Sequence, residues 1–269
     1  MSRSLGEILM LTGLLRAIGV YKLYERWLTG QVKKMSMPRH IGVILDGNRR
    51  WATEKSLSLA DGHEQGAKTG EDFLNWCLSL DIKTVTIYAF SVENFHRPKE
   101  EVEKILSLLE REALRIESDP RIHDKKMRVK VLGRLDYLPE NLRKVLNRLE
   151  EATRNYDGYY LNIAVAYGGR VEIVDAAKKI AEEIRSQRLT IDQIDETLFM
   201  KYLYTAHLPN PYPDLIIRTS GEERMSGFLL WQSAYSELTF TDVWWPDFRK
   251  IDLLRSIRTY QKRVRRFGK

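Results

Sequence analysis

The sequence predicts a single α/β domain built on a central, mostly parallel β-sheet. From Met37 onward, short apolar segments alternate with longer segments of helical periodicity, which is typical of strands joined by crossover helices. Most of the short segments are almost continuously apolar, as expected for strands that helices cover on both faces. The 269 residues are enough chain to bury a sizeable core. We therefore expect about six strands flanked by helices.

The elements follow one another in the order that this fold requires. The predicted strands span residues 41–45, 84–90, 129–132, 161–167, 215–218 and 238–241. The predicted helices lie at about 64–80, 98–117, 139–155, 170–187, 195–205 and 251–265. Pro98 begins the second helix and Glu100, Glu101 and Glu103 follow it, and both features favour a helix N-terminus. No repeat or linker divides the body, so we expect residues 37–269 to form one domain.

Residues 1–36 are predicted to form a basic, amphipathic extension. Apolar residues recur at helical spacing between Leu5 and Trp27, but charged residues such as Glu7 and Lys22 interrupt them, so the segment is too polar to span a bilayer. No signal-peptide cleavage site is evident. Two alternatives stay open: the helix lies on a membrane surface, or it packs on a partner or on the body of the protein.

The positive charge of the chain is concentrated at its two ends. Residues 1–40 hold seven Lys and Arg against two acidic residues, and residues 249–269 hold nine against one, whereas the net charge of the whole chain is only +7. A nucleic-acid binder usually interleaves basic residues with base-stacking aromatics on one face, so we expect no nucleic-acid partner. The distribution favours an anionic membrane or a polyanionic ligand, with solvated helix faces as the plainer alternative.

Several functional classes are excluded by motifs that the sequence lacks. It has no P-loop, no dinucleotide-binding glycine motif after the first strand and no Gly-x-Ser-x-Gly nucleophile elbow. The five histidines are scattered, and no set of zinc ligands clusters. Cys77 is the single cysteine, which rules out an intramolecular disulfide and suits a reducing, cytoplasmic compartment.

Polar and basic side chains follow four of the predicted strands. Asp46 to Trp51 follow the first strand, Ser91 to Pro98 the second, Gly168 to Arg170 the fourth and Arg218 to Ser226 the fifth. Because ligands of parallel sheets bind beyond the carboxyl ends of the strands, we expect these segments to meet at one rim.

The rim has the chemistry of a diphosphate site. Arginine forks match phosphate oxygens, and the glycine after Asp46 lets backbone approach a ligand closely. A carboxylate together with diphosphate oxygens supplies the ligands that Mg²⁺ prefers. Singly, these residues have plainer roles, such as a helix cap for Asp46, but together they favour a Mg²⁺–diphosphate site centred on it. The arginines are Arg49, Arg50, Arg97, Arg170, Arg218 and Arg224, and the acids expected nearby are Glu222, Glu223 and Glu237.

Five motifs, in order, resemble those of the cis-prenyltransferase family over roughly residues 38–268. They are Asp46-Gly-Asn-x-Arg-Trp51, Gly62-His-x-x-Gly66, Tyr88-Ala-Phe-Ser-x-Glu-Asn-Phe-x-Arg-Pro98, Tyr167-Gly-Gly-Arg170 and the stretch from Arg218-Thr-x-Gly-Glu to Gln232. The resemblance implies that an allylic prenyl diphosphate loses its diphosphate and is joined to isopentenyl diphosphate with a cis double bond. It also implies an apolar tunnel for the growing chain and a (Z)-polyprenyl diphosphate product, the precursor of a carrier lipid.

The resemblance implies a role for each residue of the rim. Asp46 would hold Mg²⁺ at the allylic diphosphate, with Glu237 as a second Mg²⁺ contact, and His63 and Asn94 are the candidates for proton handling. The implied substrate contacts are Gly47, Asn48, Arg49 and Arg50 for the allylic diphosphate; Ser91, Arg97, Arg218, Arg224 and Ser226 for isopentenyl diphosphate; Trp51 and Phe95 for the prenyl chain; and Val92, Glu93 and Met225 within the same segments.

Residue 59 departs from the family pattern. Leu59 stands four residues before His63, where the family usually has an arginine that reaches the allylic diphosphate. Because a leucine cannot make that contact, either another cation substitutes or the allylic substrate is held differently. A non-standard condensation, with a different primer or acceptor, is therefore an alternative to cis elongation.

The C-terminal segment Arg266-Phe-Gly268 resembles a short family motif that reaches from one subunit toward the active site of its partner. The implied assembly is a homodimer, and a frayed basic tail is the alternative. A non-catalytic partner subunit is a further alternative, but such subunits lose the catalytic motifs, and Asp46, Asn94 and Arg218 are present here. We expect a Mg²⁺-dependent cytoplasmic enzyme that contacts membranes peripherally.

Overall fold

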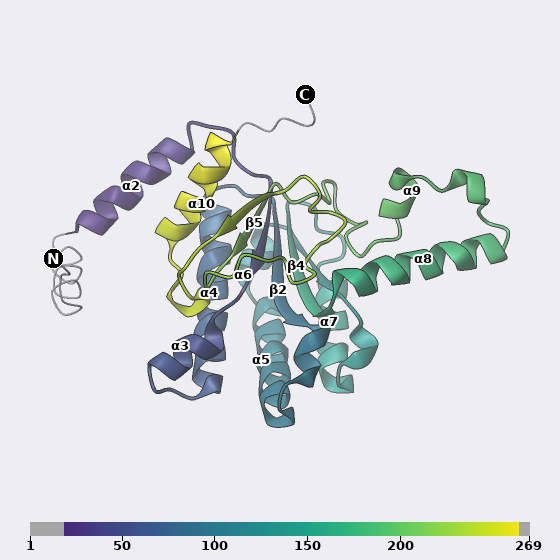
Figure 1. Ribbon diagram of the computed structural model, residues 1–269, viewed down its shortest axis with the longest axis horizontal. Coiled ribbons are helices and arrows are strands. Elements are labelled where there is room, and N and C mark those ends of the chain that lie inside the picture. The colour runs from purple at the N-terminus through teal and green to yellow at the C-terminus, as the bar shows by residue number, and fades with distance from the viewer. Residues whose placement is uncertain (1–18, 264–269) are drawn as a thin grey trace.

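A six-stranded sheet forms the centre of the molecule, and helices flank it (Figure 1). The computed structural model describes residues 19–263. The strands are β1 His40–Ile44, β2 Thr84–Ser91, β3 Met127–Leu132, β4 Tyr159–Tyr167, β5 Leu215–Arg218 and β6 Glu237–Phe240. Their order in the sheet is β3-β4-β2-β1-β5-β6, and every neighbouring pair is parallel. The predicted fold class is confirmed, because each predicted strand lies within two residues of an observed one.

The central strand β1 marks the point where the winding of the sheet reverses. One half extends from β1 through β2, β4 and β3, and the other extends through β5 and β6. A crevice forms outside the carboxyl ends of the strands at such a point. The segment that follows β1 is therefore placed beside those that follow β2 and β5.

Alternate residues of the strands enter two different cores. Leu215 and Ile217 belong to the larger core, which the sheet shares with most of the helices, whereas Ile216 packs with Phe228 and Leu229 on the other face. This alternation follows from the two-residue period of a strand. The sheet is therefore buried on both faces, as its continuous apolar segments predict.

The helices agree with most of the predicted ones. They are α2 Val20–Val32, α3 Asn48–Glu54, α4 Leu59–Ser79, α5 Lys99–Glu117, α6 Pro120–Asp124, α7 Glu140–Ala152, α8 Gly169–Arg185, α9 Glu196–Met200 and α10 Lys250–Lys262. The prediction of one helix over 195–205 is wrong, because α9 ends at Met200. The N–H of Tyr204 donates to the buried carboxylate of Glu172 instead of to a helical carbonyl, so the backbone is satisfied without a helix.

The N-terminal extension packs on the last helix, since α2 lies beside α10 (Figure 1). Leu28 and Val32 of α2 are fully buried. Three arginines stand over aromatic rings of α2 at 5.3 to 5.8 Å from the ring centroids: Arg249 over Tyr21, Arg255 over Tyr24 and Arg258 over Trp27. Each such contact is worth about 0.5–1 kcal/mol at an exposed site. One face of α2 is thus used for packing on the body of the protein, and within residues 19–263 no helix is long and apolar enough to cross a membrane.

Candidate active site

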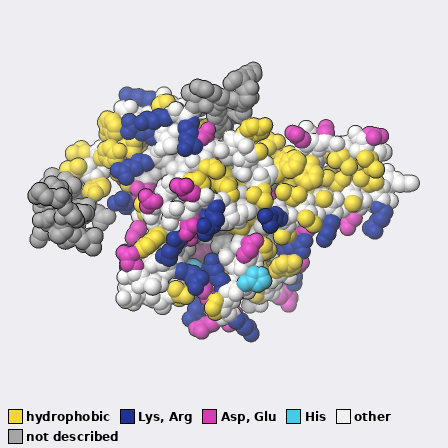
Figure 2. All heavy atoms as spheres, viewed as in Figure 1, with side chains coloured by type: hydrophobic (Ala, Val, Ile, Leu, Met, Phe, Trp, Pro, Cys, Tyr) yellow, Lys and Arg dark blue, Asp and Glu magenta, His cyan; other side chains and the backbone are white. Residues whose placement is uncertain are grey.

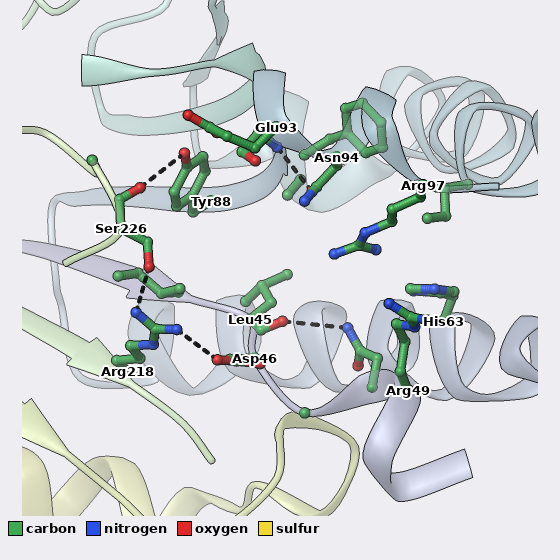
Figure 3. Close-up of a pocket in the computed structure, with 18 of the residues that line it drawn as sticks. Leu45, Asp46, Arg49, His63, Tyr88, Glu93, Asn94, Arg97, Arg218 and Ser226 are labelled. Atoms are coloured by element: carbon green, nitrogen blue, oxygen red, sulfur yellow. Dashed lines mark hydrogen bonds and ion pairs between the residues drawn. The ribbon is translucent and has the colours of Figure 1, made fainter. Parts of the chain in front are cut away.

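A pocket of about 1200 Å³ opens at the carboxyl ends of β1, β2, β4 and β5. Figure 2 shows this hollow ringed by basic and acidic side chains. Most of its polar lining comes from segments that are far apart in sequence, after β1, after β2 and after β5 (Figure 3), and His63 of α4 and Arg170 after β4 add to it. Apolar side chains line the rest: Ile44, Leu45, Leu59, Ala89, Phe90, Ile105, Val171, Leu230 and Trp244. Such a mixture of charged and apolar surface suits an amphiphilic ligand.

Most of the predicted site residues are brought together in this pocket. They are Asp46, Gly47, Asn48, Arg49, Arg50, His63, Ser91, Glu93, Asn94, Arg97, Arg218, Arg224 and Ser226. The strand ends therefore meet at one rim, as the parallel sheet predicts.

Asp46 lies two residues beyond β1 and is held by two arginines. Its Oδ2 accepts a hydrogen bond from Arg218 Nη2 at 2.7 Å, and its Oδ1 accepts one from Arg50 Nη2 at 3.1 Å. Partial burial of the carboxyl opposes ionisation, but the hydrogen bond from Arg218 and the two positive charges outweigh it and lower the pKa of Asp46. Asp46 is therefore an anion at neutral pH.

Gly47 makes the turn from β1 into α3. Its φ of 106° lies in the left-handed region, and a Cβ at this position would lie 2.8 Å from Cδ1 of Trp244. Both features demand glycine. Asn48 stabilises the same turn, because its Nδ2 donates to the carbonyl of Leu45 at 3.3 Å. The turn fixes where the following Arg49 enters the pocket.

Arg218 ends β5 and anchors the loop that follows. It is almost fully buried, and besides Asp46 it donates to the Arg224 carbonyl and, at 2.7 Å, to Ser226 Oγ. Ser220 and Ser226 in this loop have positive φ values of 76° and 46°. Such backbone costs of order 1–3 kcal/mol per residue and persists only where the surroundings impose it. Figure 3 shows the guanidinium of Arg218 between Asp46 and Ser226.

Asn94 stabilises the short 3₁₀ helix Val92–His96 that follows β2. Its Oδ1 accepts a hydrogen bond from the N–H of Ser91 at 3.1 Å. The oxygen that Asn94 would use to accept a proton is thus already bonded to the backbone.

His63 lines the pocket from α4 and is a neutral imidazole at neutral pH. Burial lowers its pKa most, and the charge of Arg97 lowers it further, whereas the nearby Glu101 raises it. His63 Nε2 is buried, makes no hydrogen bond within the described residues and faces Glu101 Oε1 at 3.6 Å. A neutral imidazole can take up a proton.

Glu101, which the sequence marks only as a residue of a helix start, organises the edge of the pocket. Its buried Oε1 lies 3.2 Å from Arg97 Nη1, 3.5 Å from Arg49 Nε and 3.6 Å from His63 Nε2. Arg97 lies in extended backbone just before α5, so the pair is close in sequence but does not share a helical face. The link to Arg49 and His63 depends on packing between helices and has no local signal.

Two other groups complete the site. Ser220 Oγ accepts a hydrogen bond from Arg50 at 2.6 Å, and Trp244 packs over Gly47. Ser220 lies in the segment that is predicted to meet the rim, whereas Trp244 follows β6 and is not among the predicted site residues.

Four residues predicted to bind substrate do not line the pocket. Phe95 packs edge-to-face on Phe90 at 4.9 Å, and the ring of Trp51 lies under Lys55 in the packing of α3. Their contact with a prenyl chain stays a prediction. The four are Trp51, Val92, Phe95 and Met225.

The expected position of Glu237 at the rim is wrong. Glu237 begins β6, opposite Leu215 at the start of β5, so it lies at the amino edge of the sheet. Asp46 lies beyond the carboxyl edge, about five residues or roughly 15 Å further along the strand direction. Glu237 instead pairs with Arg263 at 2.7 Å. Within one chain it therefore cannot share a metal ion with Asp46. Arg266 and Gly268, which were predicted to contact a partner, lie outside the described residues.

Leu59 begins α4 and contributes apolar surface to the pocket where the family pattern has an arginine. The Ser58 side chain accepts a hydrogen bond from the N–H of Asp61 and so fixes the start of this helix. The pocket wall therefore carries an apolar side chain at the position where the family pattern has a positive charge.

The acidic groups of the pocket fit Mg²⁺ only in company with a substrate. No group of three His, Cys, Asp or Glu side chains that could hold a metal occurs in the part of the chain that the structure describes. Asp46 offers one ionised carboxylate, and Mg²⁺ is commonly held by one or two carboxylates plus substrate phosphates. The donor set therefore suits Mg²⁺ carried by a diphosphate.

Comparison with known proteins agrees with this geometry. The model of the undecaprenyl diphosphate synthase family matches residues 44–268. The chain is 53% identical over 250 residues to the tritrans,polycis-undecaprenyl-diphosphate synthase (geranylgeranyl-diphosphate specific) of Methanopyrus kandleri, covering 93% of this chain and 92% of that protein. It is 50% identical over 251 residues to the enzyme of the same name from Methanocaldococcus jannaschii, covering 93% and 90%.

A solved structure shares the fold. Lavandulyl diphosphate synthase from Lavandula x intermedia, in complex with dimethylallyl diphosphate, matches with a TM-score of 0.84 and 35% identity, covering 87% of this chain and 99% of that one. The expectation of an enzyme, as opposed to a non-catalytic partner subunit, is thereby confirmed. With its motifs, its parallel sheet and its arginine-lined pocket, this chain belongs to the undecaprenyl diphosphate synthase family of cis-prenyltransferases.

Proposed function

We propose that this enzyme adds isopentenyl diphosphate units to geranylgeranyl diphosphate and forms a cis double bond at each addition. The observation that carries the proposal is Asp46, ionised and held between Arg50 and Arg218 at the mouth of the pocket. The relatives from the two methanogens are named for geranylgeranyl specificity. The three trans bonds in their product name equal the stereogenic double bonds that geranylgeranyl diphosphate brings.

The two substrates divide the arginines between them. The allylic diphosphate lies along the turn after β1, against Arg49 and Arg50, and isopentenyl diphosphate lies between Arg97 and Arg218. Asp46 stands between the two sets, which supports a role at the diphosphate that leaves. The apolar wall then receives the prenyl chain, at a gain of roughly 25 cal/mol per Å² buried.

The reaction breaks the C1–O bond of the allylic substrate, and the diphosphate leaves with the bonding electrons. The π electrons of isopentenyl diphosphate form the new bond from its C4 to that C1, and loss of a proton from C2 restores a double bond. The arginines stabilise the charge that develops on the leaving group. Mg²⁺, bound by Asp46 together with the diphosphate, would supply further charge neutralisation. His63 takes up the proton in this scheme, and Asn94 is the alternative acceptor.

A different condensation is the second candidate. Leu59 lines the pocket in place of the family's arginine, and lavandulyl diphosphate synthase, which shares the fold, was solved with dimethylallyl diphosphate. A short allylic diphosphate would then serve as primer or acceptor, and a single addition would end the reaction.

One assay separates the two candidates. Purified enzyme is incubated with Mg²⁺, radiolabelled isopentenyl diphosphate and dimethylallyl, geranyl, farnesyl or geranylgeranyl diphosphate, and the products are sized by mass spectrometry. Elongation predicts a ladder of polyprenyl diphosphates, strongest with the geranylgeranyl primer, and loss of that ladder with EDTA. A single short product from dimethylallyl diphosphate supports the second candidate. No condensation product detected by mass spectrometry with any of these diphosphates contradicts both.

The assembly that we propose is a homodimer. Figure 2 shows apolar side chains gathered over the arm that contains α8 and α9. Val174 of α8 and Ile191 and Ile194, between the two helices, are exposed. Exposed apolar patches of this kind mark interaction sites. Replacing Val174 and Ile191 with Glu should convert the dimer to a monomer in analytical ultracentrifugation, and a wild-type monomer would contradict the proposal.

The cellular setting that we propose is cytoplasmic, with peripheral contact to a membrane that receives the product as a carrier-lipid precursor. The outer face of α2 supports this, because Leu23 is exposed beside the basic residues Lys22 and Arg26. Flotation with anionic vesicles should recover the wild type and recover less of a Leu23→Asp variant. Equal recovery of the two proteins would exclude this face.

A further inference from the structure

Glu101 carries a carboxylate at a buried position, where a charged group does not favour folding by itself. Only 7% of the residue is exposed, and burying a carboxylate is costly unless positive groups compensate it. Here three groups from three elements surround one oxygen: Arg97 before α5, Arg49 of α3 and His63 of α4. The second oxygen, Oε2, is buried and has no hydrogen-bond partner among the described residues.

The geometry separates Glu101 from the groups that meet a ligand. Arg49, Arg97 and His63 all line the pocket, whereas Glu101 does not. Figure 3 shows Arg97 on one side of the cavity and Arg49 and His63 on the other, all facing the same space. A carboxylate in that space would repel a diphosphate, but behind the guanidinium groups it attracts them without touching the anion.

The charges of the two arginines need such a partner. Arg49 and Arg97 are like charges that converge on one space, and the pKa of Arg97 is lowered because burial disfavours its cation, an effect that Glu101 opposes. The two arginines come from segments more than forty residues apart in sequence, one after β1 and one after β2. The shared oxygen of Glu101 sets the spacing between them.

We propose that Glu101 is a positioning residue, which holds Arg49 and Arg97 at a fixed spacing around His63 so that the allylic and the isopentenyl diphosphate each meet an oriented guanidinium fork. The proposal rests on the proposed function, since it takes a diphosphate as the ligand. It adds a residue that touches no substrate but determines how tightly substrate is bound.

The decisive variants are Glu101→Gln, which removes the charge and keeps the shape, and Glu101→Asp, which keeps the charge and withdraws it by one methylene. The matched control is Glu100→Gln, because Glu100 lies in the same helical turn but is exposed and pairs with Lys104. Binding of inorganic pyrophosphate with Mg²⁺ is measured by titration calorimetry. KM and kcat for both substrates and the thermal midpoint are measured alongside.

Positioning predicts that Glu101→Gln and Glu101→Asp each weaken pyrophosphate binding about tenfold, the effect of roughly one lost charge-assisted contact. KM for the diphosphate substrates should rise by a similar factor while kcat falls less, and Glu100→Gln should match the wild type. Unchanged pyrophosphate affinity in both Glu101 variants would overturn the proposal, even if their thermal midpoint fell. If only Glu101→Asp folds, its affinity decides.

Failure of the proposed function would look different. In that case the wild type incorporates no isopentenyl diphosphate with any primer, yet still binds pyrophosphate in a way that depends on Glu101. Normal chemistry with wild-type KM in the Glu101 variants would instead remove the positioning role and leave the reaction intact.

Discussion

Arg218 shows how one side chain can determine both the charge and the shape of a site. Its guanidinium holds Asp46 ionised and at the same time ties the loop from Arg224 to Ser226. A lysine has one charged nitrogen and no planar fork, so it cannot serve these three acceptors together. At the scale of a residue, the arginine identity is therefore as important as its charge.

Replacing Arg218 with Lys should lower kcat/KM about 10²–10³-fold, which is the usual cost of removing one preorganised donor from a charged transition state. Arg188→Lys is the control with the same chemical change at an exposed position outside the pocket. Steady-state kinetics with the preferred primer measure both. A loss no larger in Arg218→Lys than in Arg188→Lys would show that the fork is dispensable.

His63 gives the site a pH dependence whose sign is fixed by its environment. Its pKa is lowered from 6.5, chiefly by burial, so the neutral base persists at neutral pH and is lost only as the pH falls through the lowered value. We expect kcat to fall on the acidic side below pH 6.5. Since Glu101 raises the pKa of His63, Glu101→Gln should move that acidic limb to still lower pH. A pH–rate profile in which His63→Gln keeps the same acidic limb would assign it to another group.

Helix α3, which carries Arg49 and Arg50, packs closely on two glycines of α4. A Cβ at Gly62 of α4 would lie 2.4 Å from the carbonyl oxygen of Asn48, and one at Gly66 would lie 2.4 Å from its Oδ1. The motif that contains these glycines therefore has a packing reason as well as a catalytic one, since it lets α3 approach α4.

Replacing Gly62 with Ala should destabilise the protein by about 1–3 kcal/mol, the usual cost of overpacking, and should raise KM for the allylic substrate because α3 must shift. Gly70→Ala is the matched control on the same helix, with nothing within 4 Å of its added Cβ. It should stabilise the protein by about 0.5–1 kcal/mol, because alanine favours a helix over glycine. Chemical denaturation measures both changes, and equal effects of the two would contradict the packing argument.

The sequence predicts the strands better than the helices for a physical reason. The strands are continuous apolar segments, whose pattern survives any arrangement in space. By contrast α3 begins with Asn48, Arg49 and Arg50, and it is a helix because it packs on α4. The segment after Met200 has helical periodicity but is held in turns by Glu172. Tertiary contacts determine the secondary structure of both segments, and a local sequence pattern does not reveal those contacts.

The same limit applies to the site. Asp46, Arg218 and Ser226 follow predicted strands, so their meeting could be foreseen from the parallel sheet alone. The predicted position of Glu237 at the rim is wrong because Glu237 is the first residue of its strand. It therefore lies at the amino edge of the sheet, whereas ligands bind beyond the carboxyl edge. Glu101 was overlooked because its partners lie on other helices.

At the scale of the whole molecule, α2 joins the two ends of the chain through its packing on α10. Leu28 is fully buried in this contact, whereas Leu23 is 64% exposed on the same helix. Leu28→Ala should cost about 2–5 kcal/mol in unfolding free energy, the usual range for a buried leucine, and should speed proteolysis of α2. Leu23→Ala should stay within about 0.5 kcal/mol of the wild type. Equal effects of the two substitutions would mean that α2 does not pack on α10 in solution.

The position of β1 between β2 and β5 also affects how the protein folds during its synthesis. Ile41 leaves the ribosome early, but one of its two partners is Leu215, so β1 waits with an open edge while most of the chain is synthesised. An open apolar edge can associate with other chains, so this interval is the one in which nascent protein is vulnerable to aggregation. Asp46 can pair with Arg218 only after β5 has been synthesised and has paired with β1. A chain that stops before Leu215 therefore holds most of the motifs but cannot assemble the anion site that they serve.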